Sequence, residues 1–105
     1  MFGPVVMFGL GGVLVEALGD VSFRVAPFDE DEAHRMIREI RTFKVLEGLR
    51  GAPRCDIDAI ARALSALSRF AAAHRDQIVS MEANPFLVRP EGEGAVALDA
   101  VVVSK

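Results

Sequence analysis

Residues 78–103 read IVSMEANPFLVRPEGEGAVALDAVVV, and this stretch decides the fold. Its two ends, Ile78–Val88 and Ala95–Val103, are rich in the β-branched and large apolar residues that favour strands. Between them, Pro90–Gly94 combines one proline and two glycines with acidic residues, a composition typical of turns. We therefore predict a β-hairpin over this stretch.

The hairpin carries three residues with hard oxygen atoms. Glu82 and Asn84 are two residues apart, so they lie on the same face of their strand. Folding the hairpin about Glu91-Gly92 places Asn84 directly opposite Asp99, with Cβ atoms about 4.5–5.5 Å apart. A shift of one residue would send Asp99 to the other face, so this prediction depends on the register.

Two carboxylates and an amide oxygen suit Mg²⁺, which takes its remaining ligands from water and from substrate phosphates. The spacing alone leaves a plainer alternative open. Asn84-Pro85 is also a signal for a bulge or a strand end, and Asp99 also fits a solvated position on a strand.

Two helices are predicted upstream of the hairpin. Asp29 is a good N-cap residue, and Glu32 three residues later completes the pattern of a capping box. Asp56 caps a second, longer helix that ends near His74. Apolar residues recur at helical spacing in both. They are Ala33, Met36, Ile37 and Ile40 in the first helix, and Ile57, Ile60, Ala61, Leu64, Leu67 and Ala71 in the second.

The N-terminal part is predicted to be strands joined by a glycine turn. Pro4–Gly9 is a short apolar run that we expect to be buried on both faces. The turn Gly9–Gly12 is followed by two further β-rich runs, Val13–Ala17 and Val21–Val25. It lacks the third glycine of a dinucleotide-binding fingerprint and precedes a strand, which argues against such a site. These glycines either let the backbone approach a phosphate or simply make a tight hairpin.

Strands before and after a helical block indicate an α+β fold. We expect a mainly antiparallel sheet with two helices packed on one face. At 105 residues the chain is expected to be a single domain, 1–105.

Composition and charge exclude several classes of protein. The formal net charge is -3 and the basic residues are scattered, which argues against nucleic-acid binding. The lone cysteine, Cys55, rules out an internal disulfide and fits a reducing, cytoplasmic location. The apolar run Met1–Val15 has no basic residue before Arg24, and Glu16 and Asp20 interrupt it. It is therefore neither a signal peptide nor a membrane helix.

The hydrophobic share of 51% is high for a short chain, and the apolar strand Val5–Phe8 begins almost at the first residue. We expect this to leave an unpaired edge or an exposed apolar face. Self-complementary patches close most easily with two-fold symmetry, so a homodimer is expected for the isolated chain.

The glycine turn and the strand after it match a known family. Phe8–Gly12 with Glu16, followed by Asp20–Pro27, resembles the ATP-grasp region of ADP-forming acetyl-CoA and related acyl-CoA synthetases. Leu46-x-Gly48-x-Arg50-Gly51 is similar to a motif in the middle of that region. The chain thus resembles the C-terminal lobe of an ATP-grasp domain.

The final hairpin carries the most specific part of the resemblance. Glu82–Val88 and Ala97–Ala100 are similar to the last hairpin of that family, and the β subunit of succinyl-CoA synthetase has a related one. In all, the resemblance extends from about Phe2 to Val103.

The resemblance implies specific roles for individual residues. Asn84 and Asp99 match positions that bind Mg²⁺ bridging the nucleotide phosphates, and Glu82 matches a further polar partner in the motif. Gly9, Gly11, Gly12 and Glu16 are implied to lie near the ATP or ADP site. Arg50 is implied either to meet a phosphate or to follow a helix C-cap at Gly48.

The reaction implied for the whole enzyme, an acid–CoA ligase, converts acyl-CoA, nucleoside diphosphate and phosphate into carboxylate, CoA and nucleoside triphosphate. It passes through an acyl phosphate and a phosphohistidine. Neither His34 nor His74 stands in a phosphohistidine context, so no catalytic residue is expected in this fragment.

The N-terminal ATP-grasp lobe, the CoA-binding domain and the phosphohistidine domain would come from the remainder of the synthetase. We therefore expect the isolated chain to be inactive and to bind Mg²⁺ and ATP or ADP weakly or not at all.

Two other interpretations stay open. In the first, the parent protein is a protein acyltransferase with a synthetase-like region. In the second, the chain is a non-catalytic interaction domain that kept the fold. The presence of Glu82, Asn84 and Asp99 argues against the second. A core strand directly after Met1 suggests a piece of a longer protein or a short gene.

Overall fold

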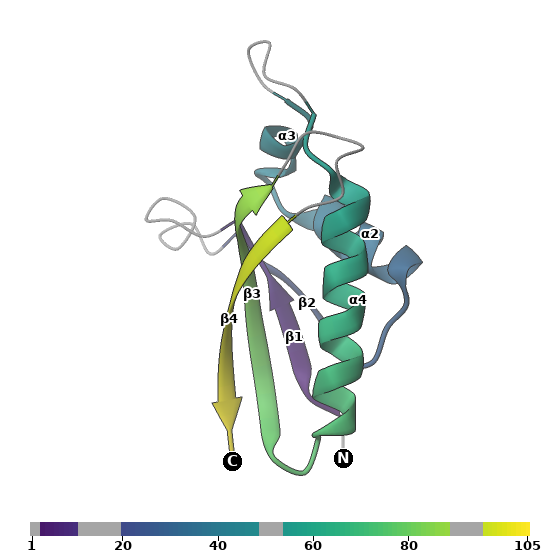
Figure 1. Ribbon diagram of the computed structural model, residues 1–105, viewed down its shortest axis with the longest axis vertical. Helices are drawn as coiled ribbons and strands as arrows, with labels where there is room; N and C mark the ends of the chain where they lie inside the picture. The colour runs from purple at the N-terminus through teal and green to yellow at the C-terminus, as the bar shows by residue number, and fades with distance from the viewer. Residues whose placement is uncertain (1–2, 11–19, 49–53, 89–95) are drawn as a thin grey trace.

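The structure, a computed structural model, describes residues 3–10, 20–48, 54–88 and 96–105, with the backbone alone at 84–88 and 96–99 (Figure 1). Its elements, labelled as in Figure 1, are β1 (Val5–Phe8), β2 (Ser22–Val25), α2 (Glu30–Glu39), α3 (Phe43–Leu46), α4 (Ile57–Ala73), β3 (Ile78–Val88) and β4 (Val96–Ser104). The predicted strand Val13–Ala17 lies outside the described residues. No helix in the described ranges is long and apolar enough to cross a membrane.

The four described strands form one sheet in the order β2-β1-β3-β4. The pairs β1–β2 and β3–β4 are antiparallel, whereas β1–β3 is parallel. The predicted α+β fold is confirmed, and two of these three pairings are antiparallel. The central parallel pair was not predicted, since β1 and β3 are joined by a crossover that passes through β2 and the helices.

The helices cover one face of this sheet, and burial along β1 shows which face it is (Figure 1). Val6 and Phe8 are fully buried, while Val5 and Met7 are half-buried. The prediction that this strand is buried on both faces is therefore wrong. Of the two outcomes that we expected for this apolar strand, an unpaired edge does not occur at β1, which has a paired strand on each side, whereas exposed apolar residues do occur on the neighbouring strands β2 and β4.

The core lies between the sheet and the helices α2 and α4. The apolar residues predicted for α2 are all buried, and those predicted for α4 are buried except Leu67, which is half-buried. Two serines of α4 are buried with them. Ser65 and Ser68 donate hydrogen bonds of 2.9 and 3.1 Å to the carbonyl oxygen of Phe28. These bonds hold the residue just before the N-cap of α2 against α4.

Both predicted helix caps are confirmed. The Asp29 carboxylate accepts a hydrogen bond of 2.8 Å from the backbone N–H of Glu32, and Asp56 does the same for Ala59 at 3.0 Å. The Glu32 carboxylate is bound by arginines, with Arg24 Nε at 2.7 Å, so it does not follow the capping-box pattern that we expected. Arg24 also contacts Glu39, and it thereby ties β2 to both ends of α2.

The short helix α3 was not predicted. Gly48 follows it with a φ of 89°, a conformation that favours glycine, and its N–H donates to the carbonyl oxygen of Val45. Gly48 therefore ends a helix, as one of the two interpretations of its motif expected.

Candidate metal and nucleotide site

The β3–β4 hairpin brings the predicted metal-binding positions together. Asn84 on β3 is the direct backbone partner of Asp99 on β4, and Glu82 is paired with Val101. The predicted pairing of Asn84 with Asp99 is confirmed, whereas beside the turn the register is shifted by one residue, so that Leu87 pairs with Ala97 and Val88 with Val96. The ladder is regular from Ser80 to Pro85, and its shifts lie on either side of that range.

Burial along β3 shows on which face of the sheet this pair lies. Met81 and Ala83 are buried toward the helices, with exposed fractions of 2% and 0%. Neighbouring residues of a strand alternate between faces, so positions 82 and 84 lie on the face without helices. Position 99 is paired with 84 and shares that face. We call this helix-free side of the sheet the open face.

Two apolar rows lie beside the candidate site on the open face. The pairing places Phe23, Met7, Glu82 and Val101 in one row across the four strands. The next row consists of Val25, Val5, Ser80 and Val103.

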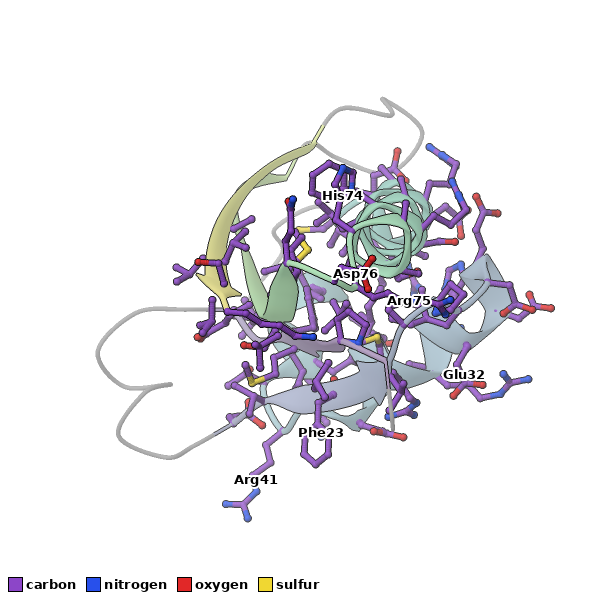
Figure 2. All side chains as sticks on the ribbon, turned by 90° about the horizontal axis from the view of Figure 1, so that it is seen from below. Phe23, Glu32, Arg41, His74, Arg75 and Asp76 are labelled. Atoms are coloured by element: carbon purple, nitrogen blue, oxygen red, sulfur yellow. The ribbon has the colours of Figure 1, made fainter. Side chains whose placement is uncertain are left out.

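Several of these side chains are well exposed, Phe23 to 63% and Val101 to 57%. Figure 2 shows the Phe23 ring projecting from the sheet on the side away from α4. Within these two rows, the described residues include no lysine or arginine. These two rows thus offer apolar surface and metal-type oxygens, but no cation for a phosphate.

The parallel pairing of β1 and β3 determines where the glycine turn begins. Phe8 is aligned with Ala83, and the N–H of Gly9 donates a hydrogen bond of 3.3 Å to the Ala83 carbonyl oxygen. The chain after β1 therefore leaves the sheet at the level of Asn84. Three further predicted residues, Gly11, Gly12 and Glu16, lie outside the described ranges, as does Arg50.

Asp20, just before β2, makes buried hydrogen bonds that the sequence did not predict. Its side chain is buried and accepts three hydrogen bonds: from the backbone N–H groups of Arg41 (2.6 Å) and Thr42 (2.9 Å), and from the Thr42 hydroxyl (2.6 Å). Burial raises the pKa of this carboxyl group, but the hydrogen bonds from Thr42 and Arg41 outweigh it, so the pKa lies below its usual value.

In sequence, Asp20 only interrupts an apolar run and begins the motif Asp20–Pro27, and neither feature indicates burial. Its partners lie more than 20 residues away, beyond the reach of local patterns.

The histidines and the cysteine occupy other parts of the molecule. His34 Nε2 on α2 lies 3.1 Å from an Asp58 oxygen on α4. His74 ends α4, and its Nδ1 lies 2.9 Å from the Phe70 carbonyl oxygen. Cys55 is half-buried just before α4. Among the side chains that the structure describes, no group of three histidine, cysteine or acidic residues is placed to hold a metal ion.

Comparison with known proteins gives matches over almost the whole chain. Residues 1–103 match the family described as the ATP-grasp domain. The β subunit of ADP-forming acetate–CoA ligase II of Pyrococcus furiosus is 44% identical over 104 residues, which is 99% of this chain and 44% of that protein. The ADP-forming acetate–CoA ligase of Methanocaldococcus jannaschii is 46% identical over 103 residues, which is 98% of this chain and 14% of that protein.

Solved structures agree with these sequence matches. The dinucleotide-forming acetyl-coenzyme A synthetase 1 of Ca. Korarchaeum cryptofilum, in complex with coenzyme A and Mg-AMPPCP, superposes with a TM-score of 0.79 at 41% identity. That match covers 100% of this chain and 48% of that one. PH1788 from Pyrococcus horikoshii gives a TM-score of 0.80 at 42% identity, over 94% of this chain and 41% of that one.

This chain therefore spans less than half the length of the relatives it matches. The resemblance inferred from the motifs is confirmed: the chain belongs to the ATP-grasp domain family, and its relatives are ADP-forming acyl-CoA synthetases.

Proposed function

We propose that this chain is the C-terminal lobe of the ATP-grasp domain of an NDP-forming acyl-CoA synthetase. In this proposal it contributes ligands for the magnesium–nucleotide complex while the enzyme converts acyl-CoA, nucleoside diphosphate and phosphate into carboxylate, CoA and nucleoside triphosphate. The observation that carries the proposal is the direct pairing of Asn84 with Asp99, with Glu82 on the same face of the sheet.

The donor set at these positions fits Mg²⁺. Asn84 and Asp99 would hold the ion with one amide oxygen and one carboxylate, and Glu82 would hold a water or a third coordination position. Mg²⁺ prefers such hard oxygen ligands and keeps its other positions for water and phosphate oxygens. When bound, the ion would neutralise charge on the transferring phosphoryl group.

The open face supplies only part of such a site. A nucleotide phosphate needs cationic or backbone N–H donors as well as the metal, and the two described apolar rows include no lysine or arginine. The glycine turn that starts at Gly9 leaves the sheet at this level and would provide N–H groups. Gly11, Gly12, Glu16 and Arg50 would lie near the nucleotide.

The other phosphate donors would come from the remainder of the synthetase, together with its N-terminal lobe, CoA-binding and phosphohistidine domains. The two acetate–CoA ligases compared above support this, since each is more than twice as long as the matched region.

A magnesium titration of the isolated chain tests the proposal directly. Adding Mg²⁺ to isotopically labelled protein should shift the backbone amide signals of Glu82, Asn84 and Asp99 together in NMR spectra. Binding should be weak, on the order of millimolar, because two or three protein oxygens make only part of an octahedral shell.

Asp99→Asn should weaken this binding about tenfold or more, because it removes one charge and keeps the size of the side chain. Asp76→Asn is the matched control, since Asp76 is an exposed carboxylate in the turn at the opposite end of β3. Equal binding by wild type and Asp99→Asn would contradict the assignment, as would signal shifts confined to other elements.

The proposal extends to self-association. The isolated chain is proposed to form a two-fold homodimer, because it exposes consecutive valines on β4 that a second copy would cover. The supporting observation is that Val101, Val102 and Val103 are each about half exposed.

A further inference from the structure

We propose that the outer edge of β4 is the surface through which two copies of this chain associate, with the two β4 strands pairing antiparallel about a two-fold axis. This inference rests on the proposed homodimer and specifies where it forms. Among the described strands, β4 ends the sheet and pairs only with β3. Figure 1 shows it as the outermost strand, with β3 between it and α4.

Within the part of the chain that the structure describes, no strand pairs with the outer edge of β4. The N–H of Lys105 donates a hydrogen bond of 2.8 Å to the Gln77 carbonyl oxygen, so the ladder with β3 continues to that residue. In an antiparallel ladder, alternate residues direct their backbone groups to opposite sides of the strand. Val102 and Ser104 therefore direct their N–H and C=O groups outward, away from β3. A second strand can bind these groups.

The part of β4 from Ala100 to Val103 carries none of the features that usually protect an edge strand. Native edge strands are commonly protected by lysine, proline, a bulge or shortness. Within β4 there is no lysine, arginine or proline in nine residues. Val101, Val102 and Val103 are exposed to 57%, 47% and 49%, so neither face of the strand is covered at this end. The opposite edge differs, since β2 has only four residues and Pro27 follows it closely.

The sequence of β4 selects one self-pairing register. A two-fold axis at Val102 places Val102 opposite Val102 of the second copy, and Val101 opposite Val103. The outward-directed residues then meet each other, as an antiparallel ladder requires. The same register places position 99, an aspartate, opposite Lys105 of the second copy. Opposite charges at directly paired positions stabilise two neighbouring strands. A shift of the register by two residues would keep the backbone hydrogen bonds but would separate these two charges.

Pairing at the edge is favoured over stacking of two open faces. Stacking would bring Glu82 and the aspartate at position 99 of each copy against the same carboxylates of the other. Like charges in contact are unfavourable, and the chain already carries a net charge of -3. Edge pairing leaves both open faces uncovered and on the same side of a continuous sheet.

The dimer should be weak. Two edge strands cover less than the roughly 1,200 Å² that stable interfaces bury, so the dissociation constant is expected on the order of tens of micromolar. Light scattering should therefore give the monomer mass at low micromolar concentration and approach the dimer mass at high micromolar concentration.

Val102→Pro tests the edge directly. Proline removes the outward N–H of this residue and leaves the ladder with β3 intact, a position in which edge strands tolerate it. The variant should remain folded by circular dichroism and stay monomeric at every concentration. Phe23→Lys is the matched control, because it changes an exposed residue on the other edge strand and should leave the dimer unchanged.

Three results would overturn the inference: wild type that stays monomeric, a Val102→Pro variant that still dimerises, or a Phe23→Lys variant that loses the dimer. If Val102→Pro unfolds, Val102→Lys provides the same test with the N–H retained and a charge placed on the edge. None of these results bears on magnesium, since Val102→Pro, Val102→Lys and Phe23→Lys leave the three candidate magnesium ligands unchanged.

Discussion

Asn84 on β3 and Asp99 on β4 are direct partners in a ladder that stays regular from Ser80 to Pro85. Their positions lie on the face of the sheet that carries no helix, next to Glu82. An amide and a carboxylate at paired positions are suited to share one cation with a nucleotide. This relationship leads to the first prediction.

In the synthetase that contains this chain, Asp99→Ala should lower kcat by about a hundredfold or more, because a lost metal ligand removes charge stabilisation from the transition state. The measurement is a coupled assay of nucleoside triphosphate formation at saturating acyl-CoA and magnesium. Asp76→Ala serves as the control and should keep nearly full turnover. A kcat for Asp99→Ala within a few fold of wild type, in protein of unchanged circular dichroism, would show that position 99 does not serve the metal.

The isolated chain should form no nucleoside triphosphate from acetyl-CoA, ADP and phosphate. Phosphoryl transfer depends on several groups positioned at once, and the two described apolar rows of the open face include no cation for a phosphate. The same coupled assay measures this, with a complete ADP-forming synthetase as the positive control. Turnover at about 1 per second or faster by the 105-residue chain would refute the proposal that it is one part of a larger site.

Asp20→Asn should lower the free energy of unfolding by about 1–3 kcal/mol, because a buried carboxylate that accepts hydrogen bonds from Thr42 and Arg41 is replaced by an amide with one acceptor oxygen. Urea denaturation at neutral pH measures this change. Asp76→Asn, at an exposed site, should change it by less than about 0.5 kcal/mol. A loss no larger than that of the control would mean that these hydrogen bonds contribute little.

Asp20 should also make the stability depend on pH. Its pKa in the folded protein lies below the usual value, so the unfolded chain binds the proton more readily. The stabilisation is therefore complete above about pH 4, the ordinary pKa of an aspartate, and it is lost as the pH falls through the lower folded-state pKa.

The pKa values of Glu32 and Glu39 are lowered as well, mainly by the hydrogen bonds from Arg24, so wild type and variant should both lose stability in acid. As the pH falls below about 4, the free energy of unfolding of Asp20→Asn should decrease less than that of wild type. Urea denaturation at several pH values measures this difference. Equal losses in the two proteins would contradict the assignment.

Several features of the fold follow from neighbouring residues alone. The caps at Asp29 and Asp56 bond N–H groups three residues further on, so a short window contains both partners. The pairing of Asn84 with Asp99 was predicted from the turn between them and the two-residue period of a strand, and the structure has the predicted register from Ser80 to Pro85 but not beside the turn.

Other features join residues that are distant in the chain, and the sequence could not show them. The parallel pairing of β1 with β3 aligns Phe8 with Ala83, and nothing near either residue indicates which strand its neighbour will be. The same holds for the burial of Asp20 against Thr42. Such contacts depend on how the crossover through the helices closes.

The sequence by itself therefore determined the strands β1 to β4, the helices α2 and α4 with their caps, and the pairing of Asn84 with Asp99, since each depends on contacts within one segment or across one turn. Only the tertiary structure decided which face of the sheet stays open, that β1 is a central strand, and that β4 is left as an edge. These features depend on which strands pair across the crossover and on where α2 and α4 pack. Local sequence patterns fit several such arrangements equally well, and the burial of apolar surface against distant residues selects one of them.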